Sequence, residues 1–245
     1  MFLLRLAEAT LAQNIRVFVF APDYHLAPVF PYPTQLEEAV AAYEYLLHEV
    51  AIPAERVVVA GDSAGGHLVL SMLVGLCQRS SLSKPGGALL FSPWLSLHHT
   101  PSTNAETDVL SASFLRATAR RFLGPARADR EETLADPFLQ FLDPHPQTGW
   151  DAVLPSSLWV SAGTNDIMFD DLVMWTHVLE ERLWRERVGW EWGEGEVPDW
   201  PWLETMAEGV KERFLQKEGK YEGFEAVMGF GRIVGERMGR GKVGV

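Results

Sequence analysis

The stretch of the chain with the clearest chemical potential centres on Ser63. A short apolar run rich in valine precedes the string Gly61-Asp62-Ser63-Ala64-Gly65-Gly66, and a long apolar segment of helix-forming residues follows it. This order predicts a strand over residues 56–60, a sharp turn, and a helix over residues 64–79. Because a serine in such a turn has its hydroxyl exposed beyond the strand, Ser63 is a candidate nucleophile. The alternative is a serine in an ordinary glycine-rich turn.

The neighbours of the serine predict how the turn would work. We expect Gly61 and Gly65 to be glycines because a side chain at either position would collide with the neighbouring strand or helix. The first N–H groups of a helix have no acceptor within the helix. The N–H of Ala64 is therefore a candidate donor to an oxyanion formed when the serine attacks a carbonyl group.

Strand and helix patterns alternate along the chain around this turn. Thr34, followed three residues later by Glu37, has the spacing of a capping box at a helix start. Strands that alternate with helices predict a parallel sheet flanked by helices, which is an α/β fold. The expected helices are 3–13, 34–48, 64–79, 110–123, 170–187, 202–217 and 223–238, and the expected strands are 15–21, 56–60, 87–92, 157–163 and 188–192.

Residues 94–151 interrupt this alternation. The segment has helical and polar stretches but no strand pattern, although it lies between two predicted strands. Ligands of open α/β sheets bind at the carboxyl ends of the strands, so this segment is expected to be a helical cap there. We therefore expect one domain over residues 1–245, with residues 94–151 inserted in it as a cap that sets substrate size.

Composition limits the function classes. The chain has 245 residues, of which 47% are hydrophobic, and a formal net charge of -12. That charge disfavours a nucleic-acid partner. A single cysteine excludes a disulfide within the chain, and we find no metal-ligand spacing or cofactor motif. The sequence shows neither a membrane span nor a cleavable leader, so a cytoplasmic protein is the expectation.

Several strings together resemble the hormone-sensitive-lipase-like branch of the α/β hydrolases. They are the serine string, Asp23-Tyr24-His25-Leu26-Ala27-Pro28, Ser92-Pro93-Trp94 and Ala135-Asp136-Pro137-Phe138. The resemblance runs from about residue 3 to about residue 203, and the fungal secondary-metabolism esterases are especially similar. It implies an α/β-hydrolase fold and a serine carboxylesterase or lipase activity on a small hydrophobic ester, without a cofactor.

The resemblance also implies a triad of serine, aspartate and histidine in that chain order. Ser63 matches the nucleophile and Asp166 matches the acid, which would hold the histidine in the right tautomer. Taken alone, Asp166 would be interpreted as a helix N-cap or a solvated carboxylate. Pro198 matches the position of the histidine, and proline cannot accept a proton.

None of the seven histidines follows His177 in the chain. His67 lies one turn beyond Ser63 on the predicted helix, so it is the candidate replacement nearest in sequence. The alternative is a histidine packed under the cap, and the placement of His67 favours it. His25 is interpreted as support for its loop. The remaining histidines, at positions 48, 98, 99, 145 and 177, are interpreted as surface or packing residues.

A second departure concerns the first strands of the family's fold. The family's His-Gly-Gly oxyanion loop lies before the helix in which this sequence begins, so we expect that loop and the first strands to be missing. An exposed sheet edge would then attract a protein partner. We interpret the chain as an ester hydrolase with impaired or no catalysis. The alternatives are a catalytically dead protein that binds a ligand or partner, and a truncated or mis-spliced product.

Overall fold

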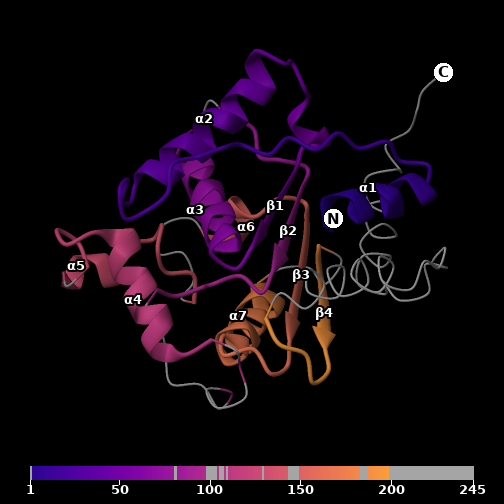
Figure 1. The fold of residues 1–245 in the computed structure, drawn as a ribbon. Coiled ribbons are helices and arrows are strands. Elements are labelled where there is room, and N and C mark those ends of the chain that lie inside the picture. The colour runs from indigo at the N-terminus through magenta and orange to yellow at the C-terminus, as the bar shows by residue number, and fades with distance from the viewer. Residues whose placement is uncertain are drawn as a thin grey trace, which may run out of the picture. The chain divides into compact units, whose positions relative to one another are not determined.

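The computed structural model describes residues 2–79, 82–97, 104, 108, 110–128, 130–142, 149–182 and 187–198. Pro22–Pro198 form one compact unit, and Met1–Ala21 belong to another. Within the first unit, four parallel strands form one sheet in the order β1 (Val58–Asp62), β2 (Gly87–Phe91), β3 (Ser157–Gly163) and β4 (Val188–Gly193). This confirms the predicted parallel α/β sheet (Figure 1).

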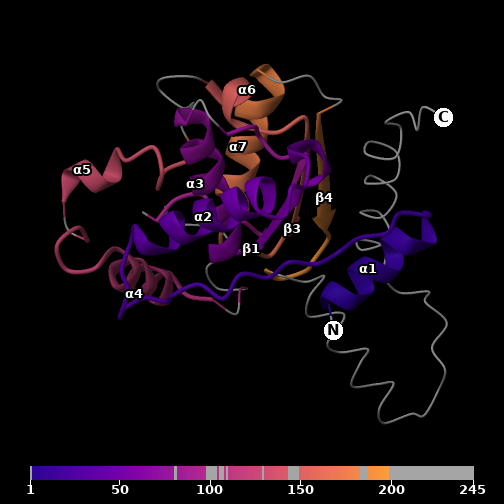
Figure 2. The same cartoon turned by 90° about the horizontal axis from the view of Figure 1, so that it is seen from above.

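Helices follow the strands in the predicted alternation. The helices α2, α3, α6 and α7 lie over one face of the sheet in both views (Figure 2). The main hydrophobic core lies between them and the sheet, and in it the fully buried Leu70 and Leu73 of α3 meet Leu90 and Val160 of the central strands. The bounds of the helices in this unit are α2 (Thr34–His48), α3 (Ala64–Gln78), α4 (Ala112–Leu123), α5 (Glu131–Leu134), α6 (Gly149–Val153) and α7 (Phe169–Arg182), with a 3-10 turn at Ala54–Arg56.

A second hydrophobic cluster lies beyond the carboxyl ends of the strands. Trp94 and Leu97 follow β2, and Ile167 and Met168 follow β3. The inner face of α4 packs against these side chains through Leu115, Ala119 and Leu123. The segment between β2 and β3 therefore packs into a separate apolar cluster, shared with Tyr32 and the residues after β3, at the end of the sheet where Ser63 lies.

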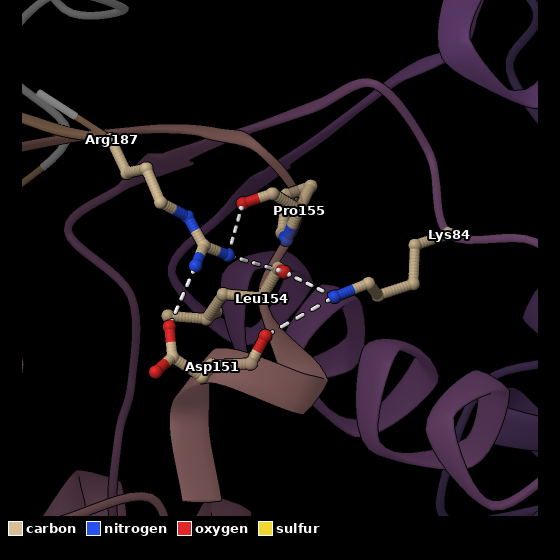
Figure 3. A network of polar contacts seen from close by, with 5 residues as sticks. All are labelled: Lys84, Asp151, Leu154, Pro155 and Arg187. Atoms are coloured by element: carbon tan, nitrogen blue, oxygen red, sulfur yellow. Dashed lines mark hydrogen bonds and ion pairs between the residues drawn. The ribbon is translucent and has the colours of Figure 1, made fainter. Parts of the chain in front are cut away.

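A polar network closes the opposite end of the sheet, next to the first residues of β2, β3 and β4 (Figure 3). Arg187 donates to the carboxylate of Asp151 at 2.7 Å and to the carbonyl oxygens of Leu154 and Pro155 at 3.0 and 3.1 Å. Lys84 donates to the carbonyl oxygens of Leu154 and Asp151 at 2.9 and 3.3 Å. Two cations thus satisfy carbonyl groups at and just beyond the end of α6, where the helix dipole is negative.

Two predictions about local structure are wrong. Residues 15–20 have no regular secondary structure, although their sequence predicted a buried strand, and Phe18 is 90% exposed. An apolar β-branched run forms a strand only where a neighbouring strand pairs with it, and the sheet does not include this run. The helix α2 has Pro33, not Thr34, as its N-cap and no capping side-chain bond. The capping box is absent because Thr34 is already helical.

Other boundaries moved only slightly. The strand expected at 56–60 is Val58–Asp62, and the helix expected at 3–13 is α1 (Phe2–Ala12), which belongs to the other unit. The helices expected after residue 200 lie outside the described residues. The expectation of a single domain over residues 1–245 stays a prediction.

Candidate active site

Ser63 occupies the sharp turn between β1 and α3. Its backbone has φ +52° and ψ −112°, in the left-handed half of conformational space that side chains rarely adopt. The surroundings hold it there, since its N–H donates to the Phe91 carbonyl oxygen at 2.8 Å and its own carbonyl oxygen accepts from the N–H groups of His67 and Trp94. The residue is half-buried. The predicted strained turn is therefore present at the end of the strand.

The glycines of the turn have different roles from those expected. A Cβ atom at Gly61 would lie 2.2 Å from the carbonyl oxygen of Gly65, so the first glycine is required. A Cβ atom at Gly65 would meet nothing within 4 Å, so the predicted collision at that position is wrong. The second position that needs glycine is Gly66, where a Cβ atom would lie 2.8 Å from the Cβ atom of Pro93.

Ala64 is the first residue of α3 and is exposed. The first acceptor within the helix, the Ser63 carbonyl oxygen, is used by the N–H of His67. The N–H groups of residues 64–66 consequently have no acceptor inside the helix. An oxygen that becomes negative beside Ser63 would meet these N–H groups and the positive end of the helix dipole.

Asp166 lies in the loop after β3 and is fully buried. Its Oδ1 accepts from the N–H of Met168 at 2.7 Å, and the hydroxyl of Ser92 is hydrogen-bonded to the same carboxylate. Oδ2 has no hydrogen-bond partner among the described residues. Burial raises the pKa of Asp166 to about 7 against these two hydrogen bonds, and the charges of Asp108 and Asp171 add to the rise.

Ser92 links the two candidate residues, and sequence reasoning gave it no role. Its N–H donates to the Ser161 carbonyl oxygen at 2.7 Å, while the carbonyl oxygen of the residue before it, Phe91, accepts from Ser63. Ser63 and Asp166 therefore follow strands on either side of β2, at the same edge of the sheet, with Ser92 between them. Ser92 also has a positive φ of 40°. Two features of the sequence could have identified Ser92: it lies at the end of a predicted buried strand, and it begins the string Ser92-Pro93-Trp94, which was already noted for its resemblance.

The loop after β4 is locked against the loop that carries Asp166. A Cβ atom at Gly163 would lie 2.1 Å from the carbonyl oxygen of Glu196, so the two backbones touch. The same oxygen accepts from the N–H of Asn165 at 2.9 Å, and the side chain of Asn165 donates to the carbonyl oxygen of Gly195 at 2.8 Å. Pro198, at the end of this loop, is buried.

The histidines in the described part of the chain are engaged elsewhere or exposed. His67 is buried under the segment between β2 and β3, where its ring packs against Phe122 and Phe141. Its Nδ1 donates to the Trp94 carbonyl oxygen at 2.8 Å, and its Nε2 has no partner in the part of the chain that the structure describes. Burial lowers the pKa of His67 to about 4, so the ring is neutral at pH 7. This placement supports the packing interpretation.

His25, His48 and His177 fit the interpretations made from the sequence. The backbone N–H and the ring of His25 are bonded to Glu38 of α2, which supports the loop before that helix. The rings of His48 and His177 are on exposed helix positions. The other three, at 98, 99 and 145, lie outside the described residues.

The described residues contain no cluster of three or more His, Cys, Asp or Glu side chains that could hold a metal ion. No helix among them combines the length and the apolar character needed to cross a bilayer.

Comparison with known families agrees with this geometry. Residues 7–197 match a family described as alpha/beta hydrolase fold. The chain belongs to this family of α/β hydrolases. The predicted resemblance to its hormone-sensitive-lipase-like members is confirmed by the relatives described next.

An acetyl-hydrolase of Streptomyces hygroscopicus is 35% identical over 158 residues, which are 62% of this chain and 48% of that protein. The hormone-sensitive lipase of Mus musculus is 41% identical over 64 residues, or 25% of this chain and 8% of the lipase. The crystal structure of an esterase from the bacterial hormone-sensitive lipase family shares the fold with a TM-score of 0.74 at 24% identity, over 97% of this chain and 70% of that chain. The chain spans about half the length of the acetyl-hydrolase.

Proposed function

We propose that this chain carries the nucleophile and acid of a carboxylic-ester hydrolase. The observation that supports this most is the pairing of Ser63 in a strained, half-buried turn with the buried Asp166 at the same edge of the sheet. The free Oδ2 of Asp166 would receive the N–H of an imidazole. The family membership supports the same chemistry.

In the proposed reaction the Ser63 hydroxyl oxygen attacks the ester carbonyl carbon, and the hydroxyl proton passes to a base. The carbonyl oxygen becomes an oxyanion, which the N–H of Ala64 and the start of α3 would stabilise. The C–O bond to the alcohol then breaks and the alcohol leaves with a proton. Water hydrolyses the resulting acyl-serine, which releases the carboxylic acid and restores the serine.

Residues 94–151 are proposed to cap this site. The second hydrophobic cluster joins α4 to the residues that follow β2 and β3, which is where substrate would bind in a sheet of this kind. Its apolar side chains favour an ester with a short or medium acyl chain.

Pro198 is proposed to occupy the place of the base. It ends the loop that is locked against the loop carrying Asp166, and a pyrrolidine ring has no titratable group. With proline there, the rate is expected to fall by several powers of ten compared with a complete triad. This favours a second candidate function, the binding of ester-like ligands with little turnover.

The test is ester turnover by four forms of the full chain: the wild type, S63A, D166N and P198H. We expect the wild type to hydrolyse p-nitrophenyl butyrate slowly and S63A to lose that activity. We expect P198H to raise kcat/KM at least tenfold, in a manner that depends on Ser63. Turnover that S63A leaves unchanged contradicts the proposal.

A fluorophosphonate probe separates the two candidate functions. Such a probe labels only a serine that can attack, so labelling of wild type but not of S63A supports hydrolysis. The binding function instead predicts no labelling, together with a melting temperature that butyrate esters raise equally in wild type and S63A.

A further inference from the structure

Two side chains from the segment between β2 and α4 contact the main chain around Asp166. The side-chain nitrogen of Asn104 donates to the carbonyl oxygens of Thr164 and Asp166, at 2.8 and 3.0 Å. One carboxylate oxygen of Asp108 accepts from the N–H of Ile167. The candidate acid is thus held by hydrogen bonds to the backbone before it, at it and after it.

These contacts satisfy backbone groups that the sheet cannot reach. The strand β3 ends at Gly163, so the Thr164 carbonyl oxygen and the Ile167 N–H lie past the last strand pairing, while the Asp166 carbonyl oxygen also accepts from the N–H of Phe169. Buried backbone groups need other partners. The second carboxylate oxygen of Asp108 accepts from the N–H of Leu110 at 2.7 Å. An asparagine at position 108 has only one acceptor oxygen and could not make both bonds in this way.

We propose that Asn104 and Asp108 are positioning residues, which fix the loop of Asp166 from the segment that we propose as the cap. They would aim the carboxylate so that Oδ1 is taken by the N–H of Met168 while Oδ2 stays open towards the base. The proposal rests on the proposed function of Asp166. The same contacts link the proposed cap directly to the loop of the candidate acid.

The charge of Asp108 makes the proposal measurable. It raises the pKa of Asp166, as the charge of Asp171 and burial also do, whereas Ser92 and the N–H of Met168 lower it. Removing that charge in D108N should lower the pKa of Asp166.

The experiment compares D108N and N104A with D136N in the full chain. Asp136 is a matched control, because its Oδ1 accepts from the N–H of Phe138 two residues later, as Asp108 accepts from Leu110. Its backbone hydrogen bonds with Thr133, Leu139 and Gln140 lie outside the loop of Asp166. Two quantities are measured by NMR: the titration of the Asp166 carboxyl carbon, assigned with D166N, and hydrogen exchange of the Ile167 amide.

We expect D108N to lower the pKa of Asp166, and both D108N and N104A to speed exchange at Ile167 about tenfold or more. D136N should leave both quantities unchanged. If D108N and N104A titrate and exchange like the wild type, the proposal is wrong. Should D108N not fold, exchange at Ile167 in N104A decides between these outcomes.

Turnover is measured in a separate experiment, so that failure of the proposed hydrolysis can be distinguished from failure of the proposed positioning role. Where p-nitrophenyl butyrate is hydrolysed, D108N and N104A should lower kcat about tenfold to a hundredfold with little change in KM, since misplacing a catalytic group acts on the transition state. An inactive wild type in which D108N and N104A still speed exchange at Ile167 contradicts the proposed hydrolysis but supports the positioning role. Unchanged kcat in both variants of an active protein contradicts positioning.

Discussion

At the scale of single residues, the backbone of the nucleophile turn depends on which positions tolerate a side chain. Ser63 keeps its positive φ because α3 begins immediately and because the end of β2 receives its N–H. This turn brings the first residues of α3 close to Gly61, and the lack of a side chain at Gly61 leaves room for their backbone. The turn is therefore set by one glycine before the serine and one at the start of the helix, Gly66.

The pair Gly61 and Gly65 gives the first prediction. G61A should lower the free energy of unfolding by about 2–4 kcal/mol, because its methyl group would overlap backbone atoms that cannot turn away. G65A should be neutral or stabilising by up to about 1 kcal/mol, since alanine is the better helix former and the space is open. Urea unfolding of both variants measures the difference, and equal losses would contradict it.

Asp166 gives a prediction on pH. Its pKa is 3.8 without the protein environment and about 7 in the fold, so the native state binds the extra proton between those values. Stability from this group is therefore present at low pH and is lost as the pH rises towards 7. D166N removes the loss and should be the more stable form at pH 8, by an amount on the order of a few kcal/mol.

The comparison of D166N with wild type across pH isolates this carboxyl group. Asp171, whose pKa burial raises to about 6, acts in the same direction, and His67 acts in the opposite direction, but both are present in each form. Urea unfolding from pH 4 to pH 8 should show the two curves separating as the pH rises. A constant difference between them would show that Asp166 titrates at its ordinary value in the fold.

At the scale of elements, the polar network around the end of α6 tests how much hydrogen bonds from a partly buried cation contribute to the stability of the fold. R187M should cost about 1–3 kcal/mol, because it leaves the carboxylate of Asp151 and two carbonyl oxygens without this donor (Figure 3). R79M is the control, since the pair of Arg79 with Glu44 at 3.4 Å is exposed on both sides and should contribute about 1 kcal/mol or less. Thermal or urea unfolding distinguishes the two.

The elements also show what periodicity can predict. The bounds of β3 and the last residue of α2 were predicted correctly from the pattern, whereas α2 begins at Thr34, the residue that was expected to be its N-cap. The run at 15–21 has the composition of a strand. A strand forms only where a neighbouring strand pairs with it, and the sequence of one segment does not show whether such a neighbour is present. The capping box failed for a related reason, since Pro33 already precedes the helix and Thr34 lies inside it.

The candidate site was predictable only in part. Ser63 and Asp166 follow strands and sit in strings with a recognisable order, so their types and positions could be read from the sequence. The contacts of Ser92, Asn104 and Asp108 with Asp166 or its loop could not. They join segments some 60 to 75 residues apart in the chain, and no local pattern records which loops meet at the end of a sheet.

At the scale of the whole molecule, exposed apolar side chains predict association. The expectation of a protein partner began with a sheet edge, and the described residues add the segment at 15–20, where Phe18 is 90% exposed. Such a side chain contributes little to folding, but it favours contact with another apolar surface. We expect this segment to take part in self-association.

F18S should reduce self-association and leave the free energy of unfolding within about 0.5 kcal/mol of the wild type. F114S is the control, because Phe114 is 54% exposed on α4. Sedimentation velocity at increasing concentration measures the effect. Equal behaviour of both variants would show that no particular exposed phenylalanine drives association.

The contact between Gly163 and Glu196 has a consequence for how this protein could change over generations. The loop ending at Pro198 is fixed by hydrogen bonds of Asn165 and Glu196 that do not involve residue 198 itself. The backbone at the position proposed for a base therefore does not depend on the side chain there. Some proline codons differ from a histidine codon by one nucleotide, so under the proposed function a lineage carrying this fold could gain or lose hydrolysis by a single point mutation without rebuilding its architecture.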